Sequence, residues 1–402
     1  MYIHRILEKS INKLSKQFKV ILVTGARQVG KSTLLKHCDS ERNYVTLDDY
    51  KAREMALNDP ELFLQRYKTP LIIDEIQYAP SLLSYIKIRV DSSDEKGQYW
   101  LTGSQQFHMM KNVTESLAGR VAIIDLKGLS LKELDNLEQV PFLPSTEYIE
   151  EMRKTSKTHD LTNIYEIIWK GAYPELNSNP ETDWETFYNS YLRTYIERDI
   201  KDLNAVKNEM DFLKFLRILA SRTGQMLDYT DISKEVGVSS PTIKSWVSIL
   251  ISSNIVYLLQ PYYTNLGNRI VKTPKIYFLD TGLCSYLTNW DNPQVLESGA
   301  MSGVIFETFV ISEVIKSYTH NAKEPNIYYY RDKEKKEIDL IIEKNGKLFP
   351  IEIKKATNPD KKAIKNFSVI PDDIIGEGAV ICLANEDYPI TRNINAIPVG
   401  YV

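Results

Sequence analysis

The stretch of sequence that decides the fold runs from residue 20 to residue 35 and reads VILVTGARQVGKSTLL. Its apolar beginning predicts a buried strand, and its end, from Thr33 onward, predicts a helix. Residues 25–32, between them, match the pattern Gly-x4-Gly-Lys-Ser/Thr of a loop that binds nucleotide phosphates. Because a strand and a helix flank the pattern, as such a loop requires, the stretch indicates an α/β domain with a nucleotide site.

The residues of this loop predict how it holds ATP and Mg²⁺. Its glycines let backbone N–H groups turn inward around the β-phosphate, and the N-terminus of the following helix adds a favourable dipole. We expect Lys31 to reach the β- and γ-phosphates and the Ser32 hydroxyl to ligate Mg²⁺. The predicted nucleotide-binding residues of the loop are Gly25, Ala26, Arg27, Gln28, Val29, Gly30, Lys31, Ser32 and Thr33.

A second part of the site is predicted where two further apolar runs end. One run ends in Asp74 and Glu75. We expect Asp74 to hold Mg²⁺ through water and Glu75 to polarise the water that attacks the γ-phosphate. A third run ends at Thr102, two residues before Ser104, and either side chain is a candidate sensor of the γ-phosphate. Thr-Gly-Ser is also ordinary turn chemistry, so both interpretations stay open here.

Length and composition allow two or three globular domains. The chain has 402 residues, of which 43% are hydrophobic and 26% charged, so no disordered or fibrous class fits. Three widely spaced cysteines, Cys38, Cys284 and Cys382, fit no metal pattern and indicate a reducing compartment. The N-terminus lacks the apolar core of a signal segment, and no apolar run approaches the roughly 20 residues that cross a bilayer. We therefore expect a cytoplasmic protein with no membrane partner. The net charge of −3 gives no general attraction to nucleic acid.

Alternating strand and helix patterns predict that the first domain is a parallel sheet covered by helices. The expected strands are residues 20–24, 44–47, 71–74, 99–102 and 121–126. In such a sheet the ligand lies at the carboxyl ends of the strands, where the motifs above fall. The polar stretch 135–160, which contains Pro141 and Pro144, is expected to be a connection to a helical segment.

The middle of the chain carries three helical patterns, at residues 212–221, 229–236 and 241–251. A short turn at Gly237 separates the last two, and this spacing is typical of a helix-turn-helix. Residues 255–259 and 270–278 suit a wing hairpin. The expected recognition helix has Lys244 as its basic residue and no other, so three alternatives are left open: contact with DNA, contact with protein, and a role that merely bridges domains.

The last part of the chain is expected to bring carboxylates together. After a helix at 303–317, strands are expected at 326–331, 337–343 and 347–354. A tight turn at Asn345-Gly346 joins the last two as a hairpin. In that hairpin Asp339 and Glu352 converge, and the period of two puts Lys354 on the same face as Glu352.

Two carboxylates with an adjacent lysine can hold Mg²⁺ and activate a water against a phosphodiester, so Asp339, Glu352 and Lys354 are predicted catalytic residues. Glu307, on the preceding helix, is expected to complete a metal site with Asp339 and Glu352. The alternative is that polar residues simply alternate on the exposed face of a hairpin. Residues 323–365 hold 12 Lys and Arg against 8 Asp and Glu, a local positive excess that suits a nucleic-acid surface.

Taken together, five short motifs resemble those of one family. They are GARQVGKS at 25–32, IDEIQ at 73–77, LTGSQ at 101–105, SLAGR at 116–120 and YIERDI at 195–200. They resemble the predicted prokaryotic ATPases of the AAA+ superfamily that carry a C-terminal domain of unknown function, with a winged-helix part and a restriction-endonuclease-like part. The resemblance covers nearly the whole chain and implies a five-stranded nucleotide-binding core with Asp74 and Glu75 at its catalytic edge. Glu307, Asp339, Glu352 and Lys354 match the endonuclease-like motif position by position.

The same resemblance makes Arg120 the candidate for an arginine that touches the γ-phosphate. It would act within its own chain or from a neighbouring subunit, and the second case requires a homo-oligomer. A plain surface arginine after Gly119 is the alternative.

The sequence thus predicts an enzyme that binds and hydrolyses ATP with Mg²⁺ and whose nucleotide state controls a C-terminal module directed to nucleic acid. Nuclease activity of that module is left open. The alternative is a nucleotide-dependent signalling or scaffold protein whose winged-helix and nuclease-like parts bind only protein partners. The predicted parts are a P-loop ATPase core of the AAA+ type at 1–134, a linker and helical lid at 135–205, a winged helix-turn-helix at 206–280 and an α/β restriction-endonuclease-like domain at 281–402.

Overall fold

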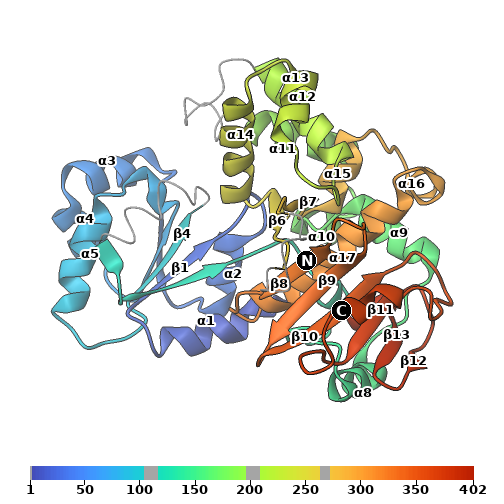
Figure 1. The fold of residues 1–402 in the computed structure, drawn as a ribbon. Coiled ribbons are helices and arrows are strands. Elements are labelled where there is room, and N and C mark those ends of the chain that lie inside the picture. The colour runs from blue at the N-terminus through green and yellow to red at the C-terminus, as the bar shows by residue number, and fades with distance from the viewer. Residues whose placement is uncertain (1, 104–115, 196–208, 263–271) are drawn as a thin grey trace.

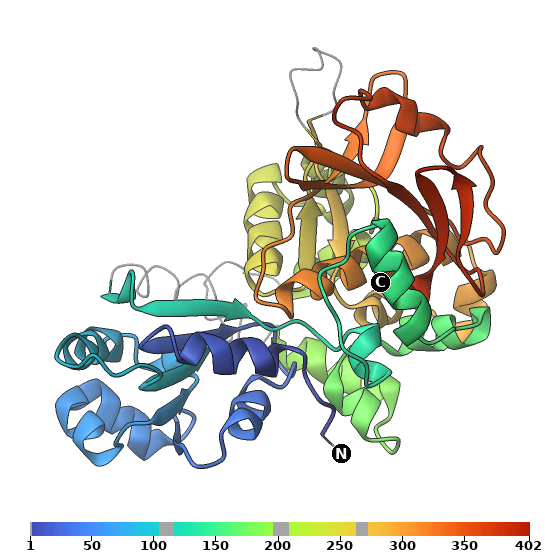
Figure 2. The ribbon, with the colours of Figure 1, turned by 90° about the horizontal axis from the view of Figure 1, so that it is seen from below.

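The computed structural model of the chain has an N-terminal sheet and a C-terminal sheet that form two lobes, with a helical part between them in the sequence (Figure 1). It describes residues 2–103, 116–195, 209–262 and 272–402. The view from below separates the same two lobes (Figure 2). The predicted α/β class is therefore confirmed, with helices covering both sheets.

The N-terminal sheet has five parallel strands in the order β2-β3-β4-β1-β5. They are β1 (Val20–Thr24), β2 (Asn43–Thr46), β3 (Leu71–Asp74), β4 (Tyr99–Gly103) and β5 (Val121–Asp125). Each lies within one residue of its predicted bounds. Every residue of β1, β3 and β4 is buried, as expected for central strands with both faces covered.

The alternation of side chains along the strands divides the core of this sheet between its two faces. Ile21 and Val23 of β1 pack with α1 (Leu7–Ser15) and α2 (Lys31–Cys38). Val20 and Leu22 pack with the opposite layer, which contains α3 (Tyr50–Asn58), α4 (Pro60–Arg66) and α5 (Leu82–Asp91). This three-layer arrangement leaves the ends of the strands as the accessible edges.

The middle part is mainly helical and includes a two-stranded antiparallel sheet. Its helices are α7 (Leu131–Leu134), α8 (Thr146–Thr155), α9 (Leu161–Lys170), α10 (Pro174–Ser178), α11 (Trp184–Tyr195), α12 (Glu209–Ser221), α13 (Tyr229–Val236), α14 (Ser240–Ser252), α15 (Thr281–Leu287) and α16 (Pro293–Ser298). The two strands are β6 (Val256–Leu259) and β7 (Lys275–Phe278). Gly237 ends α13 with a φ of 92°, at the predicted turn before α14.

The prediction that residues 135–160 form only a connection is wrong, because α8 lies within them. The helix begins just after Pro144, where Ser145 caps it by accepting a hydrogen bond from the Tyr148 N–H. Its buried face packs on the end of the chain, and the Tyr148 hydroxyl donates to the Tyr401 carbonyl at 2.7 Å. The polar composition of the stretch reflects the outer face of this helix.

The C-terminal sheet has six strands in the order β12-β13-β11-β10-β9-β8. They are β8 (Ile327–Arg331), β9 (Glu337–Lys344), β10 (Lys347–Ile353), β11 (Gly378–Cys382), β12 (Tyr388–Thr391) and β13 (Ile394–Pro398). Strands β10, β11 and β13 are parallel, and the other pairs are antiparallel. The long helix α17 (Ser302–Thr319) is buried along most of its length and packs against β7 and β10. Short 3-10 turns lie at Ile76–Tyr78, Lys365–Val369 and Val399–Tyr401.

One connected buried cluster runs from Leu7 near the N-terminus to Val402 and includes residues of both sheets and of the helical part. The two sheets and the helical part therefore share one hydrophobic core and do not pack as separate units. None of the helices in the described ranges is both long and apolar enough to span a membrane.

Candidate functional site

The loop of residues 25–32 connects β1 to α2, and two glycines give it its shape. Gly25 has a φ of 146°, and a Cβ there would meet the Leu126 carbonyl oxygen at 2.2 Å. Gly30 precedes α2 in the left-handed region with a φ of 90°. A residue with a side chain would be strained at either position, so this path of the loop depends on both glycines.

Lys31 is the first residue of α2, and only 7% of it is exposed. Its ammonium group donates hydrogen bonds to the carbonyl oxygens of Gly25 at 3.1 Å and Ala26 at 2.8 Å. The positive charge is thus held inside the loop, at a helix N-terminus whose dipole also favours an anion. This is the arrangement that a phosphate-binding loop requires.

Side chains from three other elements meet at Asp74, the last residue of β3. The Ser32 hydroxyl donates to Asp74 Oδ1 at 2.6 Å, and the Thr102 hydroxyl donates to the same oxygen. The Tyr44 hydroxyl donates to Oδ2 at 2.9 Å. Burial, and then the Asp74 carboxylate, raise the pKa of Tyr44, so that hydroxyl remains a donor at ordinary pH. The structure therefore brings Ser32, Asp74 and Thr102 together, while Ser104 lies outside the described residues.

Glu75 holds a backbone conformation that is uncommon for a residue with a side chain, with a φ of 58° and a ψ of 49°. Its N–H donates to the Thr102 hydroxyl oxygen at 3.0 Å, and Gln77 donates to its carboxylate. Such a left-handed residue costs roughly 1–3 kcal/mol and is often retained where it aims a functional side chain. Glu75 lines the same cavity as Lys31 and Ser32.

Two adjoining cavities open onto the loop. The smaller, of about 250 Å³, is lined by Lys31, Ser32 and Glu75 among others. The larger, of about 700 Å³, has a mainly apolar wall formed by Ile3, Leu129, Pro174 and Phe187 together with Tyr2. Gln28, Gly30 and Thr33 line both cavities. The sequence analysis did not single out the residues of the apolar wall as a binding site, because they come from segments far apart in the chain.

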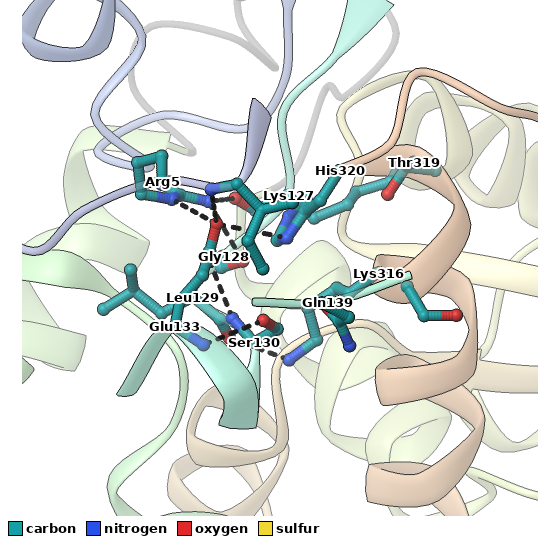
Figure 3. Close-up of polar contacts among 12 residues, drawn as sticks. Arg5, Lys127, Gly128, Leu129, Ser130, Glu133, Gln139, Lys316, Thr319 and His320 are labelled. Atoms are coloured by element: carbon teal, nitrogen blue, oxygen red, sulfur yellow. Dashed lines mark hydrogen bonds and ion pairs between the residues drawn. The ribbon is translucent and has the colours of Figure 1, made fainter. Parts of the chain in front are cut away.

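A buried arginine, Arg5, contacts the phosphate loop and the segment after β5, and Figure 3 shows its contacts with that segment. Arg5, of which 3% is exposed, donates to the carbonyl oxygens of Val29 at 2.9 Å and Lys127 at 2.8 Å. Its Nε lies 3.1 Å from Glu133 Oε1. Arg5 therefore ties the N-terminal segment, the phosphate loop and the segment after β5 to one another. Sequence patterns gave no signal for it, because its partners lie 24 to 128 residues away.

Glu133, on α7, lies between Arg5 and His320 (Figure 3). His320 directly follows the long helix α17. Burial raises the pKa of Glu133, but the charge of Arg5 and backbone hydrogen bonds outweigh this and hold it below its usual range. His320, just after α17, lies with Nδ1 3.4 Å from Glu133 Oε1. Burial lowers the pKa of His320 to about 3 in spite of that carboxylate, so the imidazole is neutral.

Two more residues of α17 hold the segment after β5. Glu313 accepts a hydrogen bond from the Leu131 N–H at 2.8 Å, and the Lys316 ammonium donates to the Leu129 carbonyl at 2.9 Å. Lys316 and Glu313 also pair with each other at 2.5 Å. A helix of the C-terminal part is therefore joined by buried polar contacts to the segment that Arg5 links to the phosphate loop.

Arg120 lies at the opposite edge of the N-terminal sheet from the phosphate loop. It directly precedes β5, which runs parallel to β1, whereas the loop follows the end of β1. A five-residue strand spans roughly 16 Å, more than an arginine side chain can reach. The Arg120 guanidinium instead pairs with Asp91 at the end of α5, at 2.5 and 2.9 Å. Of the two ways in which Arg120 could touch the γ-phosphate, action within its own chain does not fit this position, and action from a neighbouring subunit stays a prediction.

Asp339 and Glu352 meet across the β9–β10 hairpin, as predicted. Their neighbours Leu340 and Ile351 face each other in register, and the turn has Asn345 and Gly346 with positive φ. Lys354 Nζ lies 2.6 Å from Glu352 and 3.3 Å from Asp339. Burial, and then the Asp339 carboxylate, raise the pKa of Glu352 to about 8.

Glu307 does not complete a metal site with this pair. Its Oε1 accepts a hydrogen bond from the Tyr277 hydroxyl at 2.6 Å and lies 3.4 Å from Lys275 Nζ. In the described part of the chain, no three His, Cys, Asp or Glu side chains gather closely enough to hold a metal ion. The metal set of Glu307, Asp339 and Glu352 thus does not fit the arrangement observed, because a lysine and a tyrosine of β7 occupy Glu307.

Comparison with known families divides the chain into three parts. Residues 17–135 match the family model of an AAA domain. Residues 161–294 and 302–402 match two domains of unknown function, DUF8612 and DUF4143. The first match identifies the N-terminal sheet and its phosphate loop as a P-loop domain of the AAA type.

Two curated relatives are uncharacterized proteins of Mycobacterium bovis and Mycobacterium tuberculosis. Each is 25% identical over 386 residues, which cover 95% of this chain and 80% of the relative. The similarity therefore extends beyond the AAA domain, but it brings no activity with it.

Among solved structures, a Walker-type ATPase of Pyrococcus abyssi is similar over 71% of this chain and 96% of its own, with 17% identity and a TM-score of 0.41. AMPPCP-bound DnaA from Aquifex aeolicus is similar over 61% of this chain and 86% of its own, with 16% identity and a TM-score of 0.25.

Proposed function

We propose that the N-terminal domain binds ATP with Mg²⁺ and hydrolyses it. The observation that carries this proposal is the meeting of Ser32, Asp74 and Thr102 at one edge of the sheet, beside the buried ammonium group of Lys31. That edge lies at the carboxyl ends of parallel strands, where ligands bind in sheets of this kind.

The donor set at Asp74 fits Mg²⁺. Mg²⁺ prefers hard oxygen ligands, and the Ser32 hydroxyl oxygen and Asp74 Oδ1 lie 2.6 Å apart. Ser32 would ligate the ion directly and Asp74 through water. When bound, the ion neutralises charge on the β- and γ-phosphate oxygens.

Glu75 is the residue placed to orient the attacking water. The water oxygen forms a bond to the γ-phosphorus while the bond from that phosphorus to the bridging oxygen breaks and ADP departs. Glu75 accepts a hydrogen bond from the water and takes up its proton. Lys31 stays beside the β- and γ-phosphates and stabilises the charge that accumulates there.

The larger cavity is the place for the nucleoside. It adjoins the phosphate loop and is lined by Tyr2, Ile3, Pro174 and Phe187. An aromatic and aliphatic wall suits a flat base, which gains by leaving water and by stacking on a ring. The N-terminal segment and α11 then hold the base from two sides.

Phosphate release from ATP by the purified chain, with Mg²⁺ and with EDTA, tests the hydrolysis. Titration with a fluorescent ATP analogue tests the binding separately. We expect binding and Mg²⁺-dependent release, and a chain that neither binds nor releases phosphate contradicts the proposal.

For the rest of the chain we propose a module directed to nucleic acid and governed by the nucleotide state. Support comes from α13, the turn at Gly237 and α14, followed by the β6–β7 pair, which suits a winged helix. The pairing of Asp339, Glu352 and Lys354 suits an endonuclease-like fold. Against DNA readout, α14 offers one basic residue, Lys244. Protein partners are therefore the second candidate.

Binding to a fluorescent DNA duplex at several salt concentrations separates these candidates. Contact with phosphates predicts an affinity that falls as salt rises. Absence of DNA binding even at low salt, together with nucleotide-dependent capture of the same protein partner in repeated pull-downs with Glu75→Gln, favours the second candidate.

A further inference from the structure

A lysine from the two-stranded sheet reaches into the carboxylates of the C-terminal part. Lys275, the first residue of β7, has its ammonium nitrogen 2.5 Å from Glu337 Oε1 and 3.4 Å from Glu307 Oε1. Only 4% of Lys275 is exposed. Glu337 begins β9 and Glu307 lies on α17, so one lysine joins three elements.

Tyr277 strengthens the same contact from the same strand. Residues 275 and 277 lie on one face of β7 because side chains alternate along a strand. The Tyr277 hydroxyl donates to Glu307 Oε1, the oxygen that Lys275 also approaches. Glu307 is therefore already bonded to two side chains of β7.

The charges around this point form a nearly balanced set. Four carboxylates, Glu307, Glu337, Asp339 and Glu352, lie with three cations, Lys275, Lys354 and Arg331. Lys275 and Lys354 divide the four carboxylates into two pairs, one on each ammonium group. With Arg331 on Glu337, two cations offset Glu307 and Glu337, while Lys354 alone offsets one of the two charges of Asp339 and Glu352.

We propose that Lys275 is the built-in cation of this cluster and that it keeps a divalent metal out while β7 is docked. A metal placed among these carboxylates would lie close to a buried ammonium group, and in a poorly solvated site that repulsion is strong. Glu307 Oε1 also already accepts a hydrogen bond from Tyr277 and lies beside Lys275. A metal can therefore enter only if Lys275 moves away from these carboxylates. The contact of β7 with Glu307 and Glu337 thus inhibits metal binding at this cluster.

The cation held beside Asp339 is measured without nucleotide, so its identity is tested separately from ATP hydrolysis at the N-terminal domain.

Mn²⁺ titration of the full chain by calorimetry tests it. The proteins are wild type, Asp339→Asn, Lys275→Gln and the double variant, all without nucleotide. Because Asp339→Asn retains the phosphate loop, subtracting its titration removes any Mn²⁺ bound there. Lys275→Arg keeps the cation, and Arg331→Gln removes the other partner of Glu337 and serves as the matched control.

We expect wild type, Lys275→Arg, Arg331→Gln and Asp339→Asn to titrate alike. Lys275→Gln should bind one more Mn²⁺ per chain, and the double variant should lose it. If wild type binds more Mn²⁺ per chain than Asp339→Asn does, wild type already holds a metal at Asp339, and this result alone overturns the inference. A folded Lys275→Gln protein, judged by its melting curve, that gains no site overturns it as well.

Discussion

At the scale of single residues, Lys31 and Glu75 have separable tasks in the proposed ATP site. Lys31→Ala removes the ammonium group held inside the phosphate loop, so we expect nucleotide binding to be lost. Glu75→Gln keeps the loop, so it should bind ATP but hydrolyse it about 100-fold more slowly or worse. Fluorescent-nucleotide titration and phosphate release measure the two effects. Normal turnover by Glu75→Gln removes that carboxylate from the mechanism.

A second residue-scale prediction concerns pH and His320. In the folded chain burial keeps the pKa of His320 at about 3, while in the unfolded chain it should lie near its usual value. As pH falls below about 6.5, only the unfolded state takes up this proton, so stability should fall by roughly 1.4 kcal/mol per pH unit from this group. His320→Gln should lessen the slope between pH 7 and pH 5 in urea unfolding. Equal slopes for both proteins mean that His320 is protonated in the folded state.

The residues that the sequence could predict are those whose role follows from local pattern. Asp74 and Thr102 lie at the ends of strands, and Lys31 begins a helix. The hydrophobic pattern of the strands and the phosphate-loop motif therefore predict that the three side chains lie at the same edge of the sheet. Arg5 and Lys275 carry no such signal. Each owes its position to partners on distant elements, and a lone buried cation cannot be foreseen without the fold.

At the scale of elements, the Arg5–Glu133 contact joins the N-terminal segment to α7. Arg5→Ala leaves Glu133 buried without its charged partner, so we expect a loss on the order of 3–5 kcal/mol. Adding Glu133→Gln should recover part of that loss, because the unpaired charge is gone. Urea unfolding of both single variants and the double variant measures the coupling.

Arg153→Ala is the matched control for that cycle. It also breaks an arginine–carboxylate pair, with Asp387, but the Arg153 side chain is 58% exposed, so stability should change little. If the losses in Arg5→Ala and Glu133→Gln simply add in the double variant, the two side chains do not act together.

The helices and strands were predicted well where the spacing of apolar residues in the sequence matches the burial of the element in the structure. Strands β1, β3 and β4 of the first sheet are mainly apolar and buried throughout, as expected of central parallel strands. Strands β11 to β13 were not foreseen, and α8 was taken as a connection. The polar outer face of α8 and the short, partly exposed strands β12 and β13 give weak local patterns, so tertiary contacts decide them. Strand β11 is a buried apolar run that the sequence analysis passed over.

At the scale of the whole molecule, the position of Arg120 leaves its proposed role to a second copy of the chain. If a neighbouring subunit presents Arg120 to the phosphates, Arg120→Ala should lower turnover with little loss of ATP affinity, because such an arginine acts on charge in the transition state. Mixing Arg120→Ala with Glu75→Gln should then restore part of the activity. Light scattering should show an oligomer.

Asp91→Asn controls for a purely structural effect of that substitution. It breaks the Arg120–Asp91 pair but keeps the arginine, so turnover should persist. A loss equal to that of Arg120→Ala, or a monomer with no restoration on mixing, places Arg120 outside the reaction.

The contacts of α17 with the segment after β5 form late during synthesis on the ribosome, because α17 is made long after that segment. Leu129 and Leu131 are made early, but Lys316 and Glu313, which bind them, follow more than 180 residues later. At about 5–20 residues per second that delay is on the order of 10–40 s. During this interval the nascent nucleotide domain lacks its closing helix and exposes the surface that α17 later covers. A chaperone that protects nascent chains would find its substrate there.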